Sequence, residues 1–274
     1  MTLSEHHELH TYEESSFPFI FHLDTIKPYQ SDFLSHWHEN IEILYVVEGT
    51  IIVRSDSNAV KAYKDEIVFI NSNHVHHIQG TDQESKYYCL IVDCKFCEEY
   101  GLYPKEIAFE QLVRDAYASM KFLRIRDELK DQKPLYQSVV KALIVDLLIY
   151  NYRNYSLAKS PLPNKKEIEK IDIIKKAIRY MQDNYENNIS ITDIAAHAGL
   201  SKYYFCRLFK EFTGCTIVFY LNVLRCINAK NLLQSGNYLV EEAALMCGFE
   251  NLSYFTKTYK KYMGCLPSVS KKRG

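Results

Sequence analysis

Two short segments near the C-terminus share one pattern, an alanine four residues before a glycine that is followed at once by an apolar residue. Ala195 precedes Gly199 in the first segment, and Ala244 precedes Gly248 in the second. Two helices that cross steeply need a small residue at the crossing, and the turn between them needs a residue that tolerates positive φ. The pattern therefore predicts two helix-turn-helix units, which indicate a DNA-binding protein.

Charge is unevenly distributed along the 274 residues. Residues 165–274 hold 17 Lys and Arg against 10 Asp and Glu, a net charge of +7, whereas residues 1–164 hold 16 against 24, a net charge of −8. Phosphate binding requires a basic surface, and the basic part of the chain contains both predicted units. Because such a bias is also common on solvated surfaces, it adds support to the DNA-binding hypothesis and does not establish DNA binding by itself.

The composition, 47% hydrophobic and 24% charged, is typical of a globular protein, and the length favours two domains. No apolar run approaches the ~18 residues of a membrane span, so no membrane partner is expected. The polar first twelve residues lack a signal-peptide pattern, which favours a cytoplasmic protein. The eight cysteines are expected to be free and mostly buried, including those of the lone Cys94-Lys95-Phe96-Cys97 motif.

The N-terminal part alternates short apolar runs in period two with polar turns, at residues 41–47, 50–54, 66–70 and 87–92. Such strands predict an antiparallel β-barrel. Residues 104–126 and 134–152 change to helical periodicity, and each begins at a proline. The second has an apolar stripe that would pack on the preceding helix or on a second copy of the chain, making a homodimer. Its residues are Val139, Val140, Leu143, Ile144, Leu147 and Leu148.

Residues 156–166 form the predicted interdomain linker. We therefore expect an N-terminal domain at 1–155, with a helical pair at about 104–153, and a DNA-binding domain at 167–274. Helices of the second domain are expected at 167–185, 192–198, 202–212, 217–234, 240–247 and 252–263. Ser190 and Ser201 are placed to cap the second and third of them.

On the second helix of each unit, apolar core positions leave one outward face free to enter the major groove. The candidate DNA-binding residues on these faces are Lys202, Tyr203, Cys206, Arg207, Lys210, Ser253, Thr256, Lys257 and Lys260. Arg207 is the best candidate for a bidentate guanine contact. Ser253 and Thr256 can reach base edges or phosphates, and Lys257 and Lys260 suit phosphates. Since the turn of the second unit is one residue longer, the two units are not equivalent, and specificity is expected to depend more on the first.

Residues 191–267 resemble the DNA-binding domain of the AraC/XylS family of bacterial transcription regulators. The matching stretches are Ser201-Lys202-Tyr203-Tyr204-Phe205-Cys206-Arg207-Leu208-Phe209-Lys210, Thr213-Gly214, Tyr220-Leu221, Leu224-Arg225, Gly248-Phe249, Ser253-Tyr254-Phe255-Thr256-Lys257 and Gly264-Cys265-Leu266-Pro267-Ser268. The resemblance implies recognition helices in two successive major grooves of promoter DNA, with RNA polymerase as a further candidate partner. Val269-Ser270 stands where the family usually has Tyr-Arg, which puts its terminal aromatic contact in question.

His36, His38, Glu42 and Gly49 have the spacing H-x-H-x(3)-E-x(6)-G, and His76 follows a later strand. This pattern resembles the first two motifs of cupin barrels. The first three residues share strand parity and can face one interior, where with His76 they form a chemically sound metal set. Asp65 and Ser72, however, replace the glycine and proline of the second motif. We therefore expect a polar pocket without a metal cofactor, and His36, His38, Glu42 and His76 are metal candidates of lower rank.

Histidine, carboxylate and aromatic side chains suit a sugar, although other small polar molecules would also fit. The expected pocket residues are His22, His36, Trp37, His38, Glu42, Tyr45 and His76. The predicted fold is α+β and multidomain, a cupin-like antiparallel β-barrel with a helical pair followed by an all-α domain. The predicted function is a transcriptional regulator, not an enzyme, that responds to a small-molecule effector. The alternatives are a metal-dependent cupin enzyme that carries a DNA-binding domain and a ligand-independent DNA-binding protein.

Overall fold

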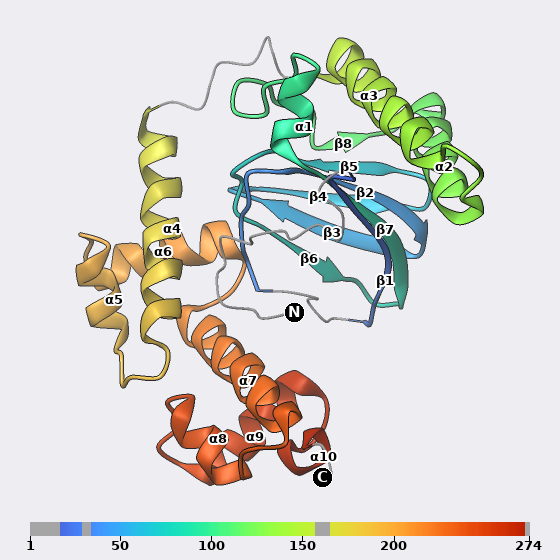
Figure 1. Ribbon diagram of the computed structural model, residues 1–274. Helices are drawn as coiled ribbons and strands as arrows, with labels where there is room; N and C mark the ends of the chain where they lie inside the picture. Colours follow the sequence, from blue (N-terminus) through green and yellow to red (C-terminus); the bar gives the residue numbers. More distant parts are fainter. Residues whose placement is uncertain (1–16, 29–33, 157–164, 272–274) are drawn as a thin grey trace. The chain divides into compact units, whose positions relative to one another are not determined.

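The computed structural model describes residues 17–28, 34–156 and 165–271 (Figure 1). The chain divides into two compact units between residues 164 and 165, and each is described by itself. The polar segment 1–16 and residues 157–164 of the predicted linker lie outside the described residues.

Two antiparallel sheets form the first unit and enclose an apolar core. One has the order β1 (Phe19–Ile26), β7 (Ser85–Val92), β2 (Ile41–Glu48), β5 (Ile67–Ile70) and β8 (Leu112–Val113). The other has the order β4 (Asn58–Tyr63), β3 (Thr50–Ser55) and β6 (His76–Gly80). The core between them draws apolar residues from both sheets. The four strands predicted from period-two runs are confirmed as β2, β3, β5 and β7.

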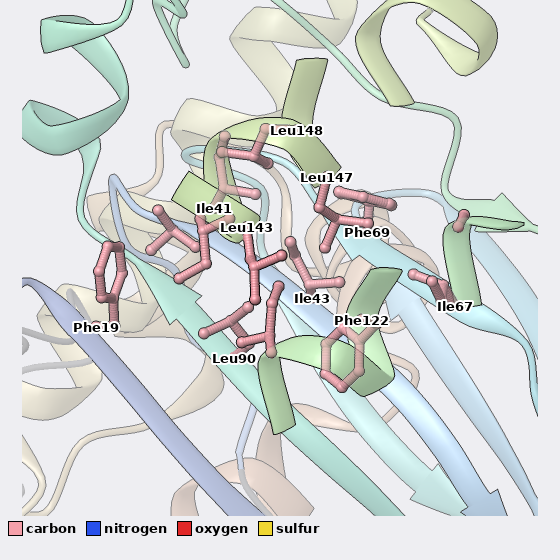
Figure 2. Close-up of a cluster of buried hydrophobic side chains, with 14 of the residues drawn as sticks. Phe19, Ile41, Ile43, Ile67, Phe69, Leu90, Phe122, Leu143, Leu147 and Leu148 are labelled. Atoms are coloured by element: carbon pink, nitrogen blue, oxygen red, sulfur yellow. The ribbon is translucent and has the colours of Figure 1, made fainter. Parts of the chain in front are cut away.

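Each strand of the larger sheet presents alternate residues to two different cores, which explains why β2 is buried on both faces. Leu44 and Val46 belong to the core between the sheets, whereas Ile41 and Ile43 pack against helices on the outer face. The helices are α1 (Cys94–Glu99), α2 (Ala116–Asp131) and α3 (Tyr136–Tyr155). Figure 2 shows this outer cluster, with side chains of α2 and α3 meeting those of β2, β5 and β7.

The helix expected from residue 104 begins only at Ala116, where the Asp115 side chain caps α2. Residues 112–113 instead form β8, which pairs with β5. The side-chain amide of Asn71 donates to the carbonyl of Phe109 at 3.0 Å and accepts from its amide at 2.8 Å. Because these contacts occupy backbone groups that a helix would need, the prediction of a helix at 104–115 is wrong.

The apolar stripe of α3 packs on the outer face of the unit's own sheet and on α2. All of its residues are buried except Val139, which is 39% exposed. The stripe is therefore no basis for a dimer, because residues buried within one copy are not available to another.

The second unit is helical and matches the predicted boundaries within two residues. It comprises α4 (Lys165–Asn184), α5 (Ile191–His197), α6 (Lys202–Thr213), α7 (Ile217–Ser235), α8 (Val240–Met246), α9 (Leu252–Met263) and the unexpected short α10 (Pro267–Ser270). The long α7 contacts α6, α8 and α9, so it joins the two predicted helix-turn-helix units. Among the described helices, none alone is long and apolar enough to span a membrane, although α6 and α7 pass that test as a bent pair.

Both turns have the predicted construction. Ala195 and Ala244 are buried, and Gly199 and Gly248 have φ of +72° and +76°. The Ser190 side chain accepts from the amide of Asp193 in a reciprocal capping box, which confirms that cap. The predicted N-cap position of Ser201 is confirmed for α6, although the Ser201 side chain makes no capping hydrogen bond.

Candidate DNA interface and ligand site

Helix α6 buries one face and exposes the face predicted to read DNA. Phe205, Leu208 and Phe209 are buried, so residues three and four positions apart form the inner side. On the other side Lys202, Arg207 and Lys210 are exposed, Cys206 is half-buried and Tyr203 is 84% exposed. The guanidinium carbon of Arg207 lies 5.5 Å from the ring centre of Tyr204. Helix α6 therefore presents three cations on its solvent face.

Helix α9 repeats this arrangement, with hydroxyl and lysine side chains on its outward face. Phe255, Thr258 and Tyr259 are buried, whereas the predicted residues Ser253, Lys257 and Lys260 are exposed and Thr256 is half-buried. The Thr256 hydroxyl donates to the carbonyl of Leu252 at 2.9 Å. With its proton engaged, this hydroxyl is left as an acceptor, which suits a base amino group better than a phosphate oxygen.

Arg225 of α7 connects the two helix-turn-helix units, a role that sequence patterns did not reveal. Its Nε and Nη2 donate to the carbonyls of Tyr185 and Asn187, both at 2.8 Å. Its guanidinium carbon lies 5.8 Å from the ring centre of Phe249, which follows the second turn. Desolvation by burial lowers the pKa of Arg225 from its ordinary value. Arg225 therefore holds the loop before α5 against the turn before α9.

Four predicted polar residues of the first unit converge in space: His36, His38, Glu42 and His76. One donor atom from each lies within 4.8 Å of the others. Nε2 of His38 and Nε2 of His76 each lie 3.1 Å from the same Oε2 of Glu42. Burial by itself raises the pKa of Glu42, but hydrogen bonds with His38 and His76 hold it well below its usual range. Glu42 is therefore a buried anion.

The remaining predicted pocket residues do not all join this cluster. His22 of β1 lies opposite Cys89 of β7 in the antiparallel register, which places its side chain on the inner face of the sheet. Nε2 of His22 lies 2.8 Å from Oδ2 of Asp24. The side chain of Trp37 is buried. Tyr45 lies on the outer face, where it stacks on Phe122 with ring centres 5.3 Å apart.

The assignment of Tyr45 to the pocket is therefore wrong, because Tyr45 is an odd number of residues from Glu42 and points to the opposite side. Sequence reasoning also missed Cys89, whose Sγ donates to Oε1 of Glu42 at 3.3 Å. The eight cysteines are free, as expected, although only half of them are buried. Burial raises the pKa of the Cys97 thiol to about 12, which favours an unreactive thiol over redox chemistry.

Comparison with known proteins identifies both units. Residues 26–148 match the AraC-like ligand binding domain, and residues 194–273 match a helix-turn-helix domain. The HTH-type transcriptional activator AarP of Providencia stuartii is 32% identical over 97 residues, covering 35% of this chain and 72% of AarP. The chain belongs to the AraC/XylS family of transcriptional regulators.

Other relatives of this AraC/XylS regulator match different shares of the chain. The HTH-type transcriptional regulator YdeC of Bacillus subtilis is 24% identical over 248 residues, covering 86% of this chain and 85% of YdeC. The raffinose operon transcriptional regulatory protein RafR of Pediococcus pentosaceus is 28% identical over 138 residues, covering 50% of this chain and 49% of RafR. These matches indicate a DNA-binding regulator with a ligand-binding N-terminal domain and not an enzyme, so the cupin-enzyme alternative is not supported.

Proposed function

We propose that α6 and α9 are the two recognition helices of this regulator and that α6 supplies most of the base discrimination. The observation that carries the proposal is the repeated exposure pattern, in which each helix buries its aromatic face and presents basic side chains to solvent. The planar guanidinium of Arg207 can donate two hydrogen bonds to the O6 and N7 acceptors of guanine in the major groove. Such a contact discriminates against other bases by about 1–3 kcal/mol. Lys257 and Lys260 suit phosphates, which add affinity without specificity.

This proposal is tested with the promoter that the full-length protein selects from sequenced genomic fragments. Arg207→Ala should weaken binding to that promoter and relax base preference at one position. Lys230→Ala is the matched control, because it removes one exposed positive charge from α7 outside the recognition helices. Lys230→Ala should leave base preference intact. Unchanged affinity and preference for Arg207→Ala would remove that residue from the recognition surface.

The effector proposed for the N-terminal domain is a sugar. Support comes from the similarity to RafR, which is named for the raffinose operon, and from the histidine and carboxylate groups on the inner face of the barrel. Raffinose, galactose, glucose and fructose are the probes, measured by the melting temperature of the full-length protein and by promoter affinity. A shift with other small metabolites and with none of these four sugars would refute the sugar assignment.

Three expectations about partners and location complete the proposal. The regulator acts in the cytoplasm, where promoter DNA lies, and contacts RNA polymerase there. It works as a homodimer, but the surface for this dimer must differ from the buried stripe of α3. Sedimentation of the full-length protein at micromolar concentration should show twice the monomer mass, and a monomer alone would contradict the dimer.

A further inference from the structure

The helical unit contains a cavity of about 210 Å³ between its two helix-turn-helix units. Its walls come from the start of α5 and the loop before it, from the first half of α7, and from Tyr254 of α9. A dry apolar cavity of about 150 Å³ can bind benzene, so this space is large enough for one six-membered ring with a small substituent. The apolar lining consists of Ile189, Ile191, Ile194, Ile217, Val218 and Leu221.

The packing of the helical unit keeps this cavity open and accessible. Ile194, Ile217 and Leu221 are buried, so the surrounding core holds these side chains in place and they do not turn to fill the space. Val218 also lines the cavity, but it is 49% exposed. A lining residue that is exposed lies where the cavity opens to solvent. A small molecule can therefore enter beside Val218 without unfolding the core.

The polar residues of the cavity offer donors to a ligand. Nε and Nη2 of Arg225 donate to the carbonyls of Tyr185 and Asn187, whereas Nη1 has no acceptor among the described residues. The side-chain amide of Asn222 donates to the Tyr254 hydroxyl at 2.8 Å, and the described residues offer no acceptor for the proton of that hydroxyl. A ligand that carries hydrogen-bond acceptors would therefore complete this set.

Arg225 is also a half-buried cation without an anionic partner. Glu250 is the carboxylate that raises its pKa, yet Oε1 of Glu250 accepts from the side-chain amide of Asn188, and no described carboxylate forms an ion pair with Arg225. Charge-assisted hydrogen bonds are about twice as strong as neutral ones, and they gain strength where water is excluded. The charge of the cavity therefore favours an anion over a neutral or cationic ligand.

We propose that this cavity binds a small monocarboxylate whose remainder is one apolar ring or a short branched chain. Arg225 supplies the positive charge, Tyr254 a second donor and the isoleucines the apolar surface. Because residues of both helix-turn-helix units line the cavity, the bound molecule contacts both and stabilises their present arrangement. The site lies wholly within the helical unit, so it is distinct from the sugar site proposed for the N-terminal unit, and it does not depend on which bases α6 contacts.

Carboxylate binding is tested on the full-length protein with cyclohexanecarboxylate, and cyclohexylmethanol is the neutral probe of matched shape. Calorimetry should show one molecule of cyclohexanecarboxylate per chain, and cyclohexylmethanol should bind roughly tenfold more weakly or worse, since it cannot form the ion pair. Urea unfolding locates the ligand. Cyclohexanecarboxylate should raise the midpoint of the helical unit, followed by far-ultraviolet circular dichroism, and leave the midpoint of the N-terminal unit, followed by Trp37 fluorescence, unchanged.

Two variants assign the binding to this cavity. Val218→Phe places a ring at the opening from an exposed position and should abolish binding of cyclohexanecarboxylate. Leu245→Phe is the matched control, because it adds the same ring at an exposed leucine of α8 outside the cavity, and it should bind as the parent does. Arg225→Gln should weaken binding of the carboxylate by roughly tenfold or more and leave cyclohexylmethanol unaffected.

Circular dichroism shows whether each variant is folded, and Val218→Phe decides the question if Arg225→Gln is not. The proposal is overturned if the parent binds cyclohexanecarboxylate no more tightly than cyclohexylmethanol, or if Val218→Phe binds the carboxylate as tightly as the parent. A shift of the Trp37 midpoint without a shift of the helical unit would also overturn it, because the carboxylate would then bind the N-terminal unit.

Discussion

Replacing Gly248 with alanine should destabilise the helical unit far more than the same change at Gly199. The φ angles of +76° and +72° are nearly equal, so both variants carry a left-handed strain of about 1–2 kcal/mol. A Cβ on Gly199 would meet nothing within 4 Å. A Cβ on Gly248 would lie 2.5 Å from the carbonyl oxygen of Tyr185 and 3.0 Å from two nitrogens of Arg225.

Arg225 would have to give way, although its guanidinium donates to the carbonyls of Tyr185 and Asn187. Hydrogen bonds from a charged group contribute about 1.5–3 kcal/mol each, so the loss of one of these two bonds should cost Gly248→Ala about 1.5–3 kcal/mol more than Gly199→Ala. Urea unfolding of the full-length protein, followed by far-ultraviolet circular dichroism, reports mainly on the helical unit. Fluorescence of Trp37, the single tryptophan, follows unfolding of the N-terminal unit. The urea midpoint of that transition should be the same in both variants and in the parent. Losses that agree within about 0.5 kcal/mol would refute this packing argument.

Two further predictions concern caps. Ser190→Ala should destabilise the helical unit by about 1 kcal/mol, whereas Ser201→Ala should have little effect because Ser201 makes no side-chain capping bond; equal losses in urea unfolding would contradict this. Asp115, the N-cap residue of α2, accepts hydrogen bonds from the hydroxyls of Tyr150 and Tyr155, and these bonds lower its pKa below the ordinary value. The Asp115 carboxylate therefore stabilises the fold above about pH 4, and this stabilisation is lost as the pH falls through the folded-state pKa. Asp115→Asn should therefore lower the melting temperature at pH 7, and a difference from the parent that persists unchanged at pH 3 would count against this.

The helical unit could be predicted closely because its boundaries depend on local chemistry. Helices α6, α7 and α9 end at glycines with left-handed φ, namely Gly214, Gly236 and Gly264, and these glycines are visible in the sequence. The segment 104–115 could not be predicted in this way. Its conformation depends on a contact between Asn71 and Phe109, which are 38 residues apart, and periodicity carries no information about such a partner.

The apolar stripe of α3 shows that periodicity also cannot predict which surface a helix packs against. Periodicity predicted a wide apolar face and could not choose between a neighbouring helix and a second copy of the chain. The stripe packs on the preceding helix α2, as one of the two alternatives predicted, and also on the outer face of the larger sheet, where Ile41 and Ile43 of β2 lie. Tyr45 shares that face, so strict use of strand parity would have excluded it from the pocket without any structure.

The metal candidates show why agreement with a motif is an incomplete test of a site. The sequence argued against a metal because Asp65 and Ser72 stand where glycine and proline are expected, yet Asp65 adopts a left-handed φ of +68°, which aspartate tolerates better than most residues. The three imidazole rings are oriented by carbonyl oxygens of Leu34, Asn40 and His74, which lie 3.0, 3.1 and 2.9 Å from Nδ1 of His36, His38 and His76. Every residue has a carbonyl, so no pattern of residue types can encode these contacts. Only the folded backbone brings these carbonyl oxygens to the three Nδ1 atoms, so the orientation of the rings could not be predicted from the sequence.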